Sequence, residues 1–131
     1  LLCRRAIEPR YGYWTLPAGF MENAETTIEA AARETLEEAL ADVTIEGLYS
    51  IIDVPHINQV HMFYRASLID GQFGAGEESL ESRLFSPGEI PWDEISFPTV
   101  RKTLELFLID METERFGVHV SDIRHPMGKK A

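Results

Sequence analysis

The residues best suited to chemistry lie in one stretch of the chain, from Gly19 to Ala41. Three of its carboxylates, Glu34, Glu37 and Glu38, fall at positions i, i+3 and i+4 of a segment with helical periodicity. Residues three and four apart share one face of a helix, so these carboxylates crowd together. Such crowding is unfavourable unless a cation lies there, and oxygen-only ligands suit Mg²⁺ or Mn²⁺. The stretch therefore predicts a divalent-metal site on a helix.

A Glu-rich helix also has a second interpretation, because most such helices present a solvated face with ion pairs between residues four apart. Arg33 and Glu37 would form one such pair. The positions before the helix favour the metal site. Gly19 follows the turn Leu16-Pro17-Ala18, and Glu25 precedes Arg33 at a fixed spacing.

Together these residues resemble the Nudix box, G-x5-E-x7-R-E-U-x-E-E-x-G-U, in which U is apolar. The matching positions are Gly19, Glu25, Arg33, Glu34, Glu37, Glu38 and Ala41. Two positions depart from the box, because Thr35 replaces an apolar residue and Leu40 replaces the glycine at the helix end. Glycine there supplies a left-handed C-cap. Leucine would pay ~1–2 kcal/mol for that conformation, so we expect the helix to exit differently and the site to stay intact.

The resemblance implies an enzyme that hydrolyses a nucleoside diphosphate linked to another moiety, with Mg²⁺ (or Mn²⁺) as cofactor. The metal would neutralise charge at phosphorus and orient the attacking water. The metal ligands that it implies are Glu34, Glu38, Glu37 and the carbonyl of Ala18. The residues with an implied structural role are Gly19, Glu25 and Arg33, of which Arg33 and Glu25 should pair and fix the loop over the helix start. The implied catalytic residues are Glu34, Glu37 and Glu78.

Glu78 is included among the catalytic residues because sites of this family usually take a further carboxylate from a loop distant in sequence. Glu77, Glu78 and Glu81 follow a glycine-rich loop, and we expect Glu78 to be the base or an outer metal ligand. The alternative is a solvated loop acid, since loops are both polar and functional.

Basic and aromatic residues near the box are candidates for holding the substrate. Arginines that could contact phosphates are Arg4, Arg5 and Arg10. Aromatic side chains that could stack on adenine or flavin rings are Tyr11, Trp14, Phe20 and Phe63. The expected substrate-binding set is Arg5, Arg10, Trp14 and Phe20. Each of these side chains also has an ordinary interpretation as core or surface packing.

Segments outside the box resemble one Nudix subgroup. They are 2–9, 14–22, 78–81 and 89–92. Bacterial members of this subgroup often carry an N-terminal zinc ribbon, and its plant relatives hydrolyse FAD and ADP-ribose type dinucleotides. The resemblance implies a dinucleotide substrate such as FAD, ADP-ribose or NADH. A house-cleaning hydrolase of nucleoside triphosphates and a non-catalytic ligand-sensing module are the alternatives.

Length and composition predict one globular domain, because the chain has 131 residues, 44% hydrophobic and 26% charged. We expect a single Nudix domain over residues 1–131, truncated at its N-terminus, with residues 112–131 as a C-terminal extension. The net charge of −10 disfavours nucleic acid and anionic membranes as partners. The single cysteine, Cys3, excludes an internal disulfide framework and fits a reducing cytoplasm. The oligomeric state stays open, with a homodimer as one alternative.

Periodicity and turn residues place the elements that must position the box. Strands are expected over 1–7, 13–16, 43–54, 59–69, 80–86 and 116–120. Helices are expected from the capping box Thr26-x-x-Glu29 to Ala39, and over 98–111. This order predicts an α+β fold. The resemblance makes it a Nudix-type α/β/α sandwich with a mixed sheet, lacking a strand that the family has upstream.

Overall fold

The computed structural model describes residues 1–124 of the chain. Its strands are β1 (Leu2–Arg5), β2 (Trp14–Thr15), β3 (Val43–Val54), β4 (Gln59–Leu68), β5 (Ser79–Arg83) and β6 (His119–Asp122). Its α-helices are α1 (Thr27–Ala39) and α2 (Pro98–Thr113). Short 3-10 helices occur at Pro55–Ile57, Pro87–Glu89 and Trp92–Glu94. None of the helices within residues 1–124 is long and apolar enough to cross a membrane.

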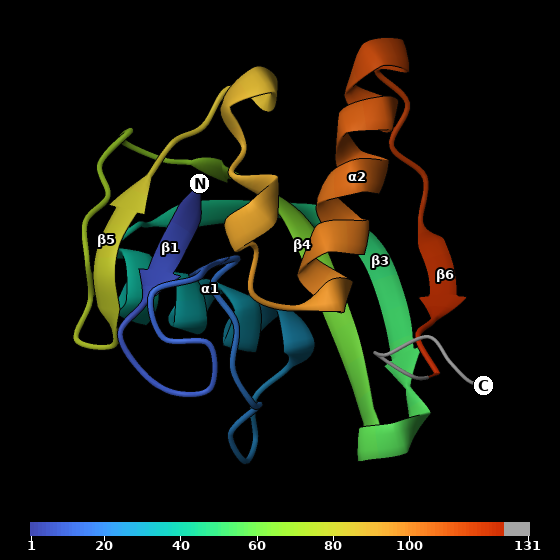
Figure 1. Cartoon of the computed structure of the whole chain (residues 1–131), viewed down its shortest axis with the longest axis horizontal. Coiled ribbons are helices and arrows are strands. Elements are labelled where there is room, and N and C mark those ends of the chain that lie inside the picture. Colours follow the sequence, from blue (N-terminus) through green and yellow to red (C-terminus); the bar gives the residue numbers. More distant parts are fainter. Residues whose placement is uncertain (125–131) are drawn as a thin grey trace.

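The strands form two sheets with a helix on each side (Figure 1). One sheet has the order β2-β1-β5 and is antiparallel throughout. The other has the order β4-β3-β6, in which β3 is antiparallel to β4 and parallel to β6. In Figure 1, α1 lies behind the strands and α2 lies in front of them. This arrangement is the expected α+β sandwich, in which the mixed sheet is β4-β3-β6.

The last strand begins later than the sequence predicts. We expected it over 116–120, whereas β6 covers His119–Asp122. Phe116 instead packs its ring against Phe107 of α2, with the centroids 5.4 Å apart. Aromatic packing therefore holds this part of the chain before the ladder with β3 begins. Of the expected extension over 112–131, residues 125–131 lie outside the described residues.

Strand β1 connects the two halves of the core, because successive side chains of a strand point to opposite faces. Leu2 and Cys3 are 2% and 1% exposed. Leu2 lies in a buried cluster together with Trp14, Ile95 and Val100, which includes the start of α2. Cys3 lies in a second cluster with Ala39 and Ala41, at the end of α1. Each helix therefore packs against its own face of the same strand.

Helix α1 begins as its sequence predicts. The hydroxyl of Thr26 accepts a hydrogen bond from the Glu29 backbone N–H at 3.1 Å, and the Glu29 carboxylate accepts one from the Thr26 N–H at 2.9 Å. This reciprocal capping box satisfies two N–H groups that a helix start leaves unpaired. The capping box therefore fixes the first turn of α1 through neighbouring residues alone. It thereby also sets which face of the helix the later carboxylates occupy.

The exit of α1 contradicts the expectation from the sequence. Leu40 is the C-cap and adopts the left-handed conformation, with φ 48° and ψ 35°. The expectation that leucine would avoid this geometry was wrong, because the glycine-rich loop compensates for the strain. The N–H of Gly74 donates to the Ala39 carbonyl at 2.7 Å, and the N–H of Gly76 donates to the Glu38 carbonyl at 3.1 Å. These bonds satisfy carbonyls that the last turn of a helix leaves free.

Replacement of Gly76 by alanine tests how tightly this loop fits. A Cβ at Gly76 would lie 1.7 Å from the Glu37 carbonyl oxygen, which is a backbone atom and cannot rotate away. We expect Gly76→Ala to lower the free energy of unfolding by about 1–3 kcal/mol, measured by urea denaturation. Gly88→Ala is the control, because a Cβ there meets nothing within 4 Å. Equal stability of the two variants would show that the loop is not held against α1.

Candidate active site

Arg33 holds the carboxylates of α1 and the preceding loop together. Its Nε and Nη2 contact the two oxygens of Glu25 at 2.5 and 3.1 Å, and its Nη1 contacts Glu34 at 2.6 Å and Glu37 at 3.3 Å. Nη2 also donates to the Phe20 carbonyl at 3.2 Å. The hydrogen bonds between Arg33 and Glu25 lower the pKa of the carboxyl and raise the pKa of the guanidinium. The pair that the sequence predicts is therefore present, and it ties the loop to the helix.

Glu38 lies in a different environment from Glu25. Burial and, next in size, a hydrogen bond with Glu34 together raise the pKa of Glu38 to about 8. One of its oxygens accepts a hydrogen bond from the Ala18 N–H at 3.1 Å, which opposes the shift. Glu34 and Glu38 thus form a close carboxylate pair beside Ala18. Without a cation, Glu38 therefore keeps its proton to a higher pH than an ordinary glutamic acid does.

The box glycine is required by close contact with this pair. A Cβ built at Gly19 would lie 2.4 Å from the carboxyl carbon of Glu34. No other residue type leaves that space free, since even alanine carries a Cβ. Gly19 therefore allows the backbone that follows Ala18 to approach the carboxylates of α1 directly.

The model of the NUDIX domain matches residues 1–107, a span that includes α1, its loop and the strands around them. The chain belongs to the NUDIX family. A crystal structure of a NUDIX hydrolase from Nitrosomonas europaea has a TM-score of 0.92 with this chain at 49% sequence identity. The match covers 95% of this chain and 70% of that chain.

The relatives of this chain with assigned names carry the names of different activities. An ADP-ribose pyrophosphatase of Methanocaldococcus jannaschii is 32% identical over 95 residues, covering 70% of this chain and 56% of that protein. An 8-oxo-(d)GTP phosphatase of Mycolicibacterium smegmatis is 28% identical over 102 residues, covering 76% of this chain and 31% of that protein. The chain thus spans between about a third and about a half of the length of these two relatives.

The acids after the glycine-rich loop of this NUDIX domain have separate environments. Glu81 faces β1, where Arg4 donates to its carboxylate at 3.3 Å. Glu77 and Glu78 are exposed. The charge of Glu78 contributes to the raised pKa of Glu38, so it acts on the pair of carboxylates. Of the three loop acids, Glu78 is the one that the structure couples to α1.

The four expected substrate-binding residues are not equally accessible. The Phe20 residue is 79% exposed, in the loop that Arg33 holds. Trp14 is 5% exposed and packs edge-on against Phe85, so its ring belongs to the core. Arg5 and Arg10 lie in and after β1, and the guanidinium groups of both stack on aromatic rings, of Phe97 and Tyr13 respectively. Phe20 is the aromatic candidate that lies free beside the box.

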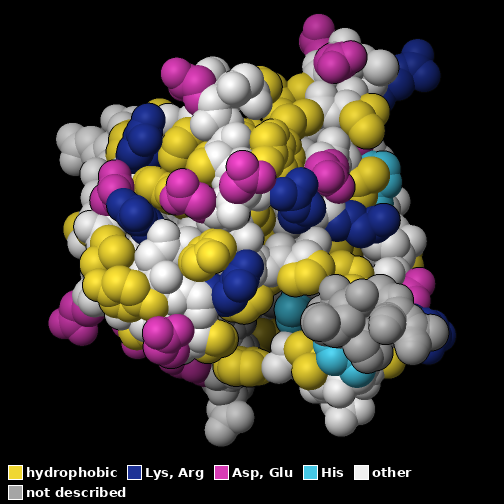
Figure 2. Space-filling view, viewed as in Figure 1, with side chains coloured by type: hydrophobic (Ala, Val, Ile, Leu, Met, Phe, Trp, Pro, Cys, Tyr) yellow, Lys and Arg dark blue, Asp and Glu magenta, His cyan; other side chains and the backbone are white. Residues whose placement is uncertain are grey.

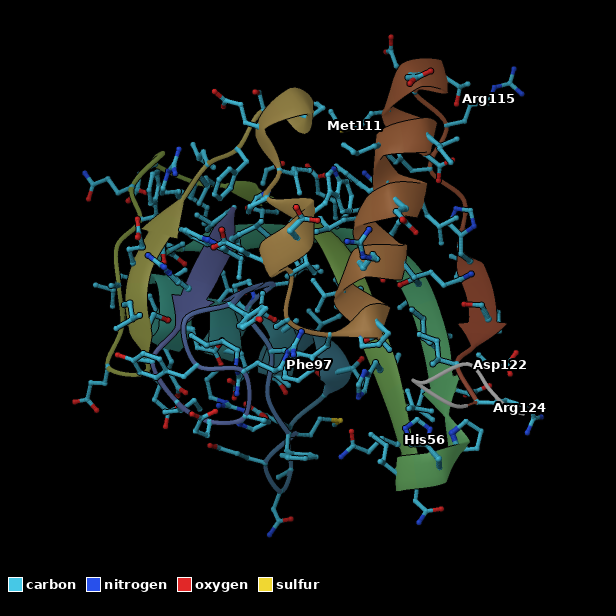
Figure 3. The ribbon with its side chains drawn as sticks, in the orientation of Figure 1. His56, Phe97, Met111, Arg115, Asp122 and Arg124 are labelled. Carbon is cyan, nitrogen blue, oxygen red and sulfur yellow. The ribbon has the colours of Figure 1, made fainter. Side chains whose placement is uncertain are left out.

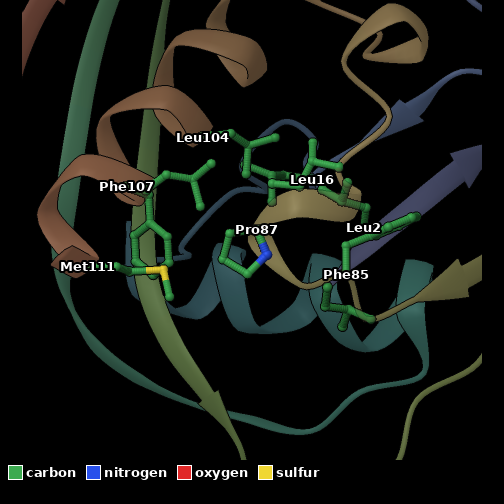
Figure 4. Close-up of a pocket in the computed structure, with 10 residues that line it drawn as sticks. Leu2, Leu16, Phe85, Pro87, Leu104, Phe107 and Met111 are labelled. Carbon is green, nitrogen blue, oxygen red and sulfur yellow. The ribbon is translucent and has the colours of Figure 1, made fainter.

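The surface and cavities add two observations. On the face in Figure 2, basic side chains lie among acidic and apolar ones, although the chain as a whole is strongly acidic. A cavity of about 150 Å³ lies between α2 and β1 (Figure 4). Its lining is entirely apolar and includes Leu2, Leu16, Phe85, Pro87, Leu104, Phe107 and Met111. It offers no group that could act on a phosphate.

Some residues that shape this molecule were not predicted from the sequence. Gly76 was assigned only to a glycine-rich loop, although it lies against the backbone of α1. Ser96 and Arg101 were not assigned any role, although both line a second cavity at the start of α2. The available signal was the dipeptide Phe97-Pro98, which starts a helix without a capping side chain.

The donor set fits a divalent cation of the kind that the family implies. Within residues 1–124, no three His, Cys, Asp or Glu side chains are arranged to hold a metal together. Helix α1 brings two together, Glu34 and Glu38, while Glu37 is turned to Arg33. A cation placed between the two carboxylates would replace their proton, which is the usual linkage between metal binding and protonation. Oxygen donors alone suit Mg²⁺ or Mn²⁺.

The protonation of Glu38 predicts how stability depends on pH in chelator-treated protein. Because the pKa is raised from 4.5 to about 8 on folding, the folded state binds a proton that the unfolded state has released. The free energy of unfolding should therefore fall as pH rises through this window. We expect the stability of Glu38→Gln, measured by thermal unfolding, to fall less steeply than that of wild type between about pH 5 and about pH 8.

Glu112→Gln is the control for this measurement, because Glu112 is an exposed residue near the end of α2. It removes one carboxyl from the chain and should leave the wild-type slope unchanged. Identical slopes for wild type and Glu38→Gln would contradict the assigned proton.

Proposed function

We propose that this chain is a metal-dependent pyrophosphohydrolase, which cleaves the diphosphate of a nucleoside diphosphate linked to another moiety. The observation that carries the proposal is the Glu34–Glu38 pair, half-buried beside the Ala18 N–H and held by Arg33. A solvated acidic face would not bury like charges against one another, because burial penalises the ionised form. The family membership of residues 1–107 supports the same conclusion.

The proposed ligands of Mg²⁺ (or Mn²⁺) are Glu34, Glu38, Glu37 and the carbonyl of Ala18. When bound, the cation neutralises charge on the phosphate oxygens. Arg33 keeps Glu34 oriented through its hydrogen bond, and the Ala18 N–H does the same for Glu38. Glu37, which is 57% exposed in its side chain, would have to turn from Arg33 to join the set. The protein thus supplies a rigid pair and one adjustable carboxylate.

Glu78 is the proposed base that takes the proton of the attacking water. Two observations support it over its neighbours. Its charge acts on Glu38, and its loop is fixed to the end of α1 by Gly74 and Gly76. Glu81 is occupied by Arg4 in the sheet. A general base has to lie within hydrogen-bond reach of its proton, so the proposal requires the Glu78 carboxylate to reach the water at the carboxylate pair.

For the substrate, we propose a dinucleotide such as ADP-ribose, FAD or NADH. The likeness to the ADP-ribose pyrophosphatase supports this class, as does the resemblance of segments 78–81 and 89–92 to the subgroup with zinc-ribbon and plant members. Phe20 is exposed and aromatic beside the box, where it can stack on a ring system. The likeness to the 8-oxo-(d)GTP phosphatase favours a second candidate, a nucleoside triphosphate.

The setting of the enzyme follows from the same chemistry. Cys3 is a buried free thiol, which supports a reducing cytoplasm. The net charge of −10 supports a small nucleotide as partner instead of nucleic acid or an anionic membrane. We treat residues 1–131 as one catalytic domain and leave a homodimer as an open alternative.

A substrate panel in the presence of Mg²⁺ or Mn²⁺ tests the proposal. We expect AMP plus ribose 5-phosphate from ADP-ribose, or AMP plus FMN from FAD, without inorganic pyrophosphate. Activity should vanish with a chelator. Glu38→Gln should lose ~10²-fold or more of kcat, whereas Glu112→Gln should keep it. Faster release of pyrophosphate from a nucleoside triphosphate than of AMP from any dinucleotide would establish the second candidate instead.

Glu78→Gln tests the assignment of the base. We expect kcat to fall with KM little changed, because the lost interaction belongs to the transition state. The matched changes Glu77→Gln and Glu81→Gln remove the same charge from the same segment and should keep activity. If one of them is damaging and Glu78→Gln is not, the base lies elsewhere in the segment.

A further inference from the structure

A second cavity, of about 380 Å³, lies at the start of α2 and has no role in the site on α1. It is formed by the segment before α2, the first turns of α2 and the loop after β1. Its lining consists of Arg10, Trp92, Asp93, Ile95, Ser96, Phe97, Pro98 and Arg101. In contrast to the apolar cavity beside Leu2, it combines charged and aromatic side chains.

Two guanidinium groups of this cavity are held in place by contacts that leave donors available. Arg10 donates from Nε to the Ser96 carbonyl at 2.9 Å, and its guanidinium carbon lies 4.1 Å from the centre of the Tyr13 ring. Arg101 donates from Nη2 to the Trp92 carbonyl at 2.6 Å, and its Nη1 lies 3.6 Å from the Glu105 carboxylate, which offsets part of its charge. A guanidinium carries five N–H donors, so these bonds orient both groups without using them up.

The backbone adds to the positive potential of the cavity. Helix α2 begins at Pro98 with Phe97 as its N-cap, and no side chain caps its first N–H groups. Its first turn carries no acidic residue. A helix start bears a partial positive charge and is a common place for anions.

Ser96 gives an independent sign of a missing partner. The residue is 3% exposed and lines the cavity, yet its hydroxyl has no hydrogen-bond partner within residues 1–124. Buried polar groups are almost always paired, so an unpaired one asks for an explanation. The backbone N–H of Ser96 already bonds the Trp14 carbonyl, so the hydroxyl is the group of this residue that stays unpaired beside the cavity.

The charges that face the cavity favour an anion with a neighbouring hydroxyl group. Arg10 and Arg101 line it, and the guanidinium carbon of Arg5 lies 5.0 Å from the centre of the Phe97 ring at its edge. Asp93 is the acidic residue in the lining. A carboxylate accepts hydrogen bonds, so it suits a sugar hydroxyl beside the anion. Arginine forks match the oxygens of phosphate.

We propose that this cavity binds a phosphate monoester, with Arg10 and Arg101 as its principal contacts. The ligand has two sources that share this chemistry. It is either a phosphate-bearing part of a substrate that also reaches α1, or a separate sugar phosphate. The Ser96 N–H bonds the Trp14 carbonyl, and Trp14 and Ala18 are separated by at most about 14 Å of extended chain. A substrate bound at α1 could therefore also place a phosphate group in this cavity, whereas a separate sugar phosphate would enter it directly.

Titration of chelator-treated protein with ribose 5-phosphate or inorganic phosphate tests the cavity. Without a cation, the carboxylate pair on α1 repels phosphate, so this result does not depend on the proposed hydrolysis. We expect saturable NMR shifts at the Ser96 and Phe97 amides and at the Trp92 indole N–H. Saturable shifts elsewhere but not at these groups, or no saturable shifts, would overturn the proposal.

Variants then assign the contacts. We expect Arg10→Gln and Arg101→Gln each to weaken binding about tenfold, the loss expected for one charge-assisted hydrogen bond. Arg115→Gln is the matched control and should bind as wild type, because Arg115 lies beyond the opposite end of α2 from Phe97 (Figure 3). Thermal unfolding of each variant separates lost binding from lost structure. Unchanged binding in both variants would overturn the proposal.

Kinetics in the presence of Mg²⁺ identify the source of the ligand. If the cavity holds part of the substrate, Arg101→Gln should raise KM with kcat unchanged, and ribose 5-phosphate should compete with the substrate. If a separate molecule binds, KM should not change in the absence of that molecule. Either result supports the cavity as a phosphate site, given saturable binding in the titration.

Discussion

Repulsion among the carboxylates of α1 is the constraint on which the site depends. Glu34, Glu37 and Glu38 share a face, and the fold places Arg33 on one side of them and buries Glu38 on the other. Arg33 neutralises part of the charge and fixes the entering loop through Glu25. The remaining repulsion contributes to the raised pKa of Glu38, and a cation is the group that could replace its proton. The affinity of the site for a cation thus comes from negative charge on α1 that the folded chain does not neutralise.

The surrounding elements convert this local pattern into a site. The two faces of β1 anchor different helices, with Leu2 in the cluster near α2 and Cys3 at the end of α1. The loop before α1 brings Ala18 and Gly19 to the carboxylates. The loop before β5, which carries Glu78, is bonded to the backbone of the helix at Glu38 and Ala39. Hydrogen bonds to α1 hold both loops in place. Their position therefore does not follow from the local conformational preferences of the loop residues.

Much of this could be predicted from the sequence, where the cause was local. The capping box of Thr26 and Glu29, the periodicity of α1 and the alternation of β4 depend on neighbouring residues. The pairing of Arg33 with Glu25 followed from spacing in the box. The conformation of Leu40 was predicted wrongly, because its strain is offset by Gly74 and Gly76, far along the chain. The phosphate cavity was missed for the same reason, as its walls come from the loop after β1 and the segment before α2.

The glycine-rich loop before β5 and the loop before α1 are attached to α1 in different ways. Ser79 donates its hydroxyl to the Glu38 carbonyl at 2.8 Å, and Gly74 and Gly76 bond the same end of the helix. The segment that carries Glu78 is therefore anchored to the backbone of the helix that carries Glu38. By contrast, residues 18–24 are all exposed and are tied to α1 mainly through side chains. Of the two loops around the carboxylates, one is thus attached to α1 mainly through backbone carbonyls of the helix and the other mainly through its side chains.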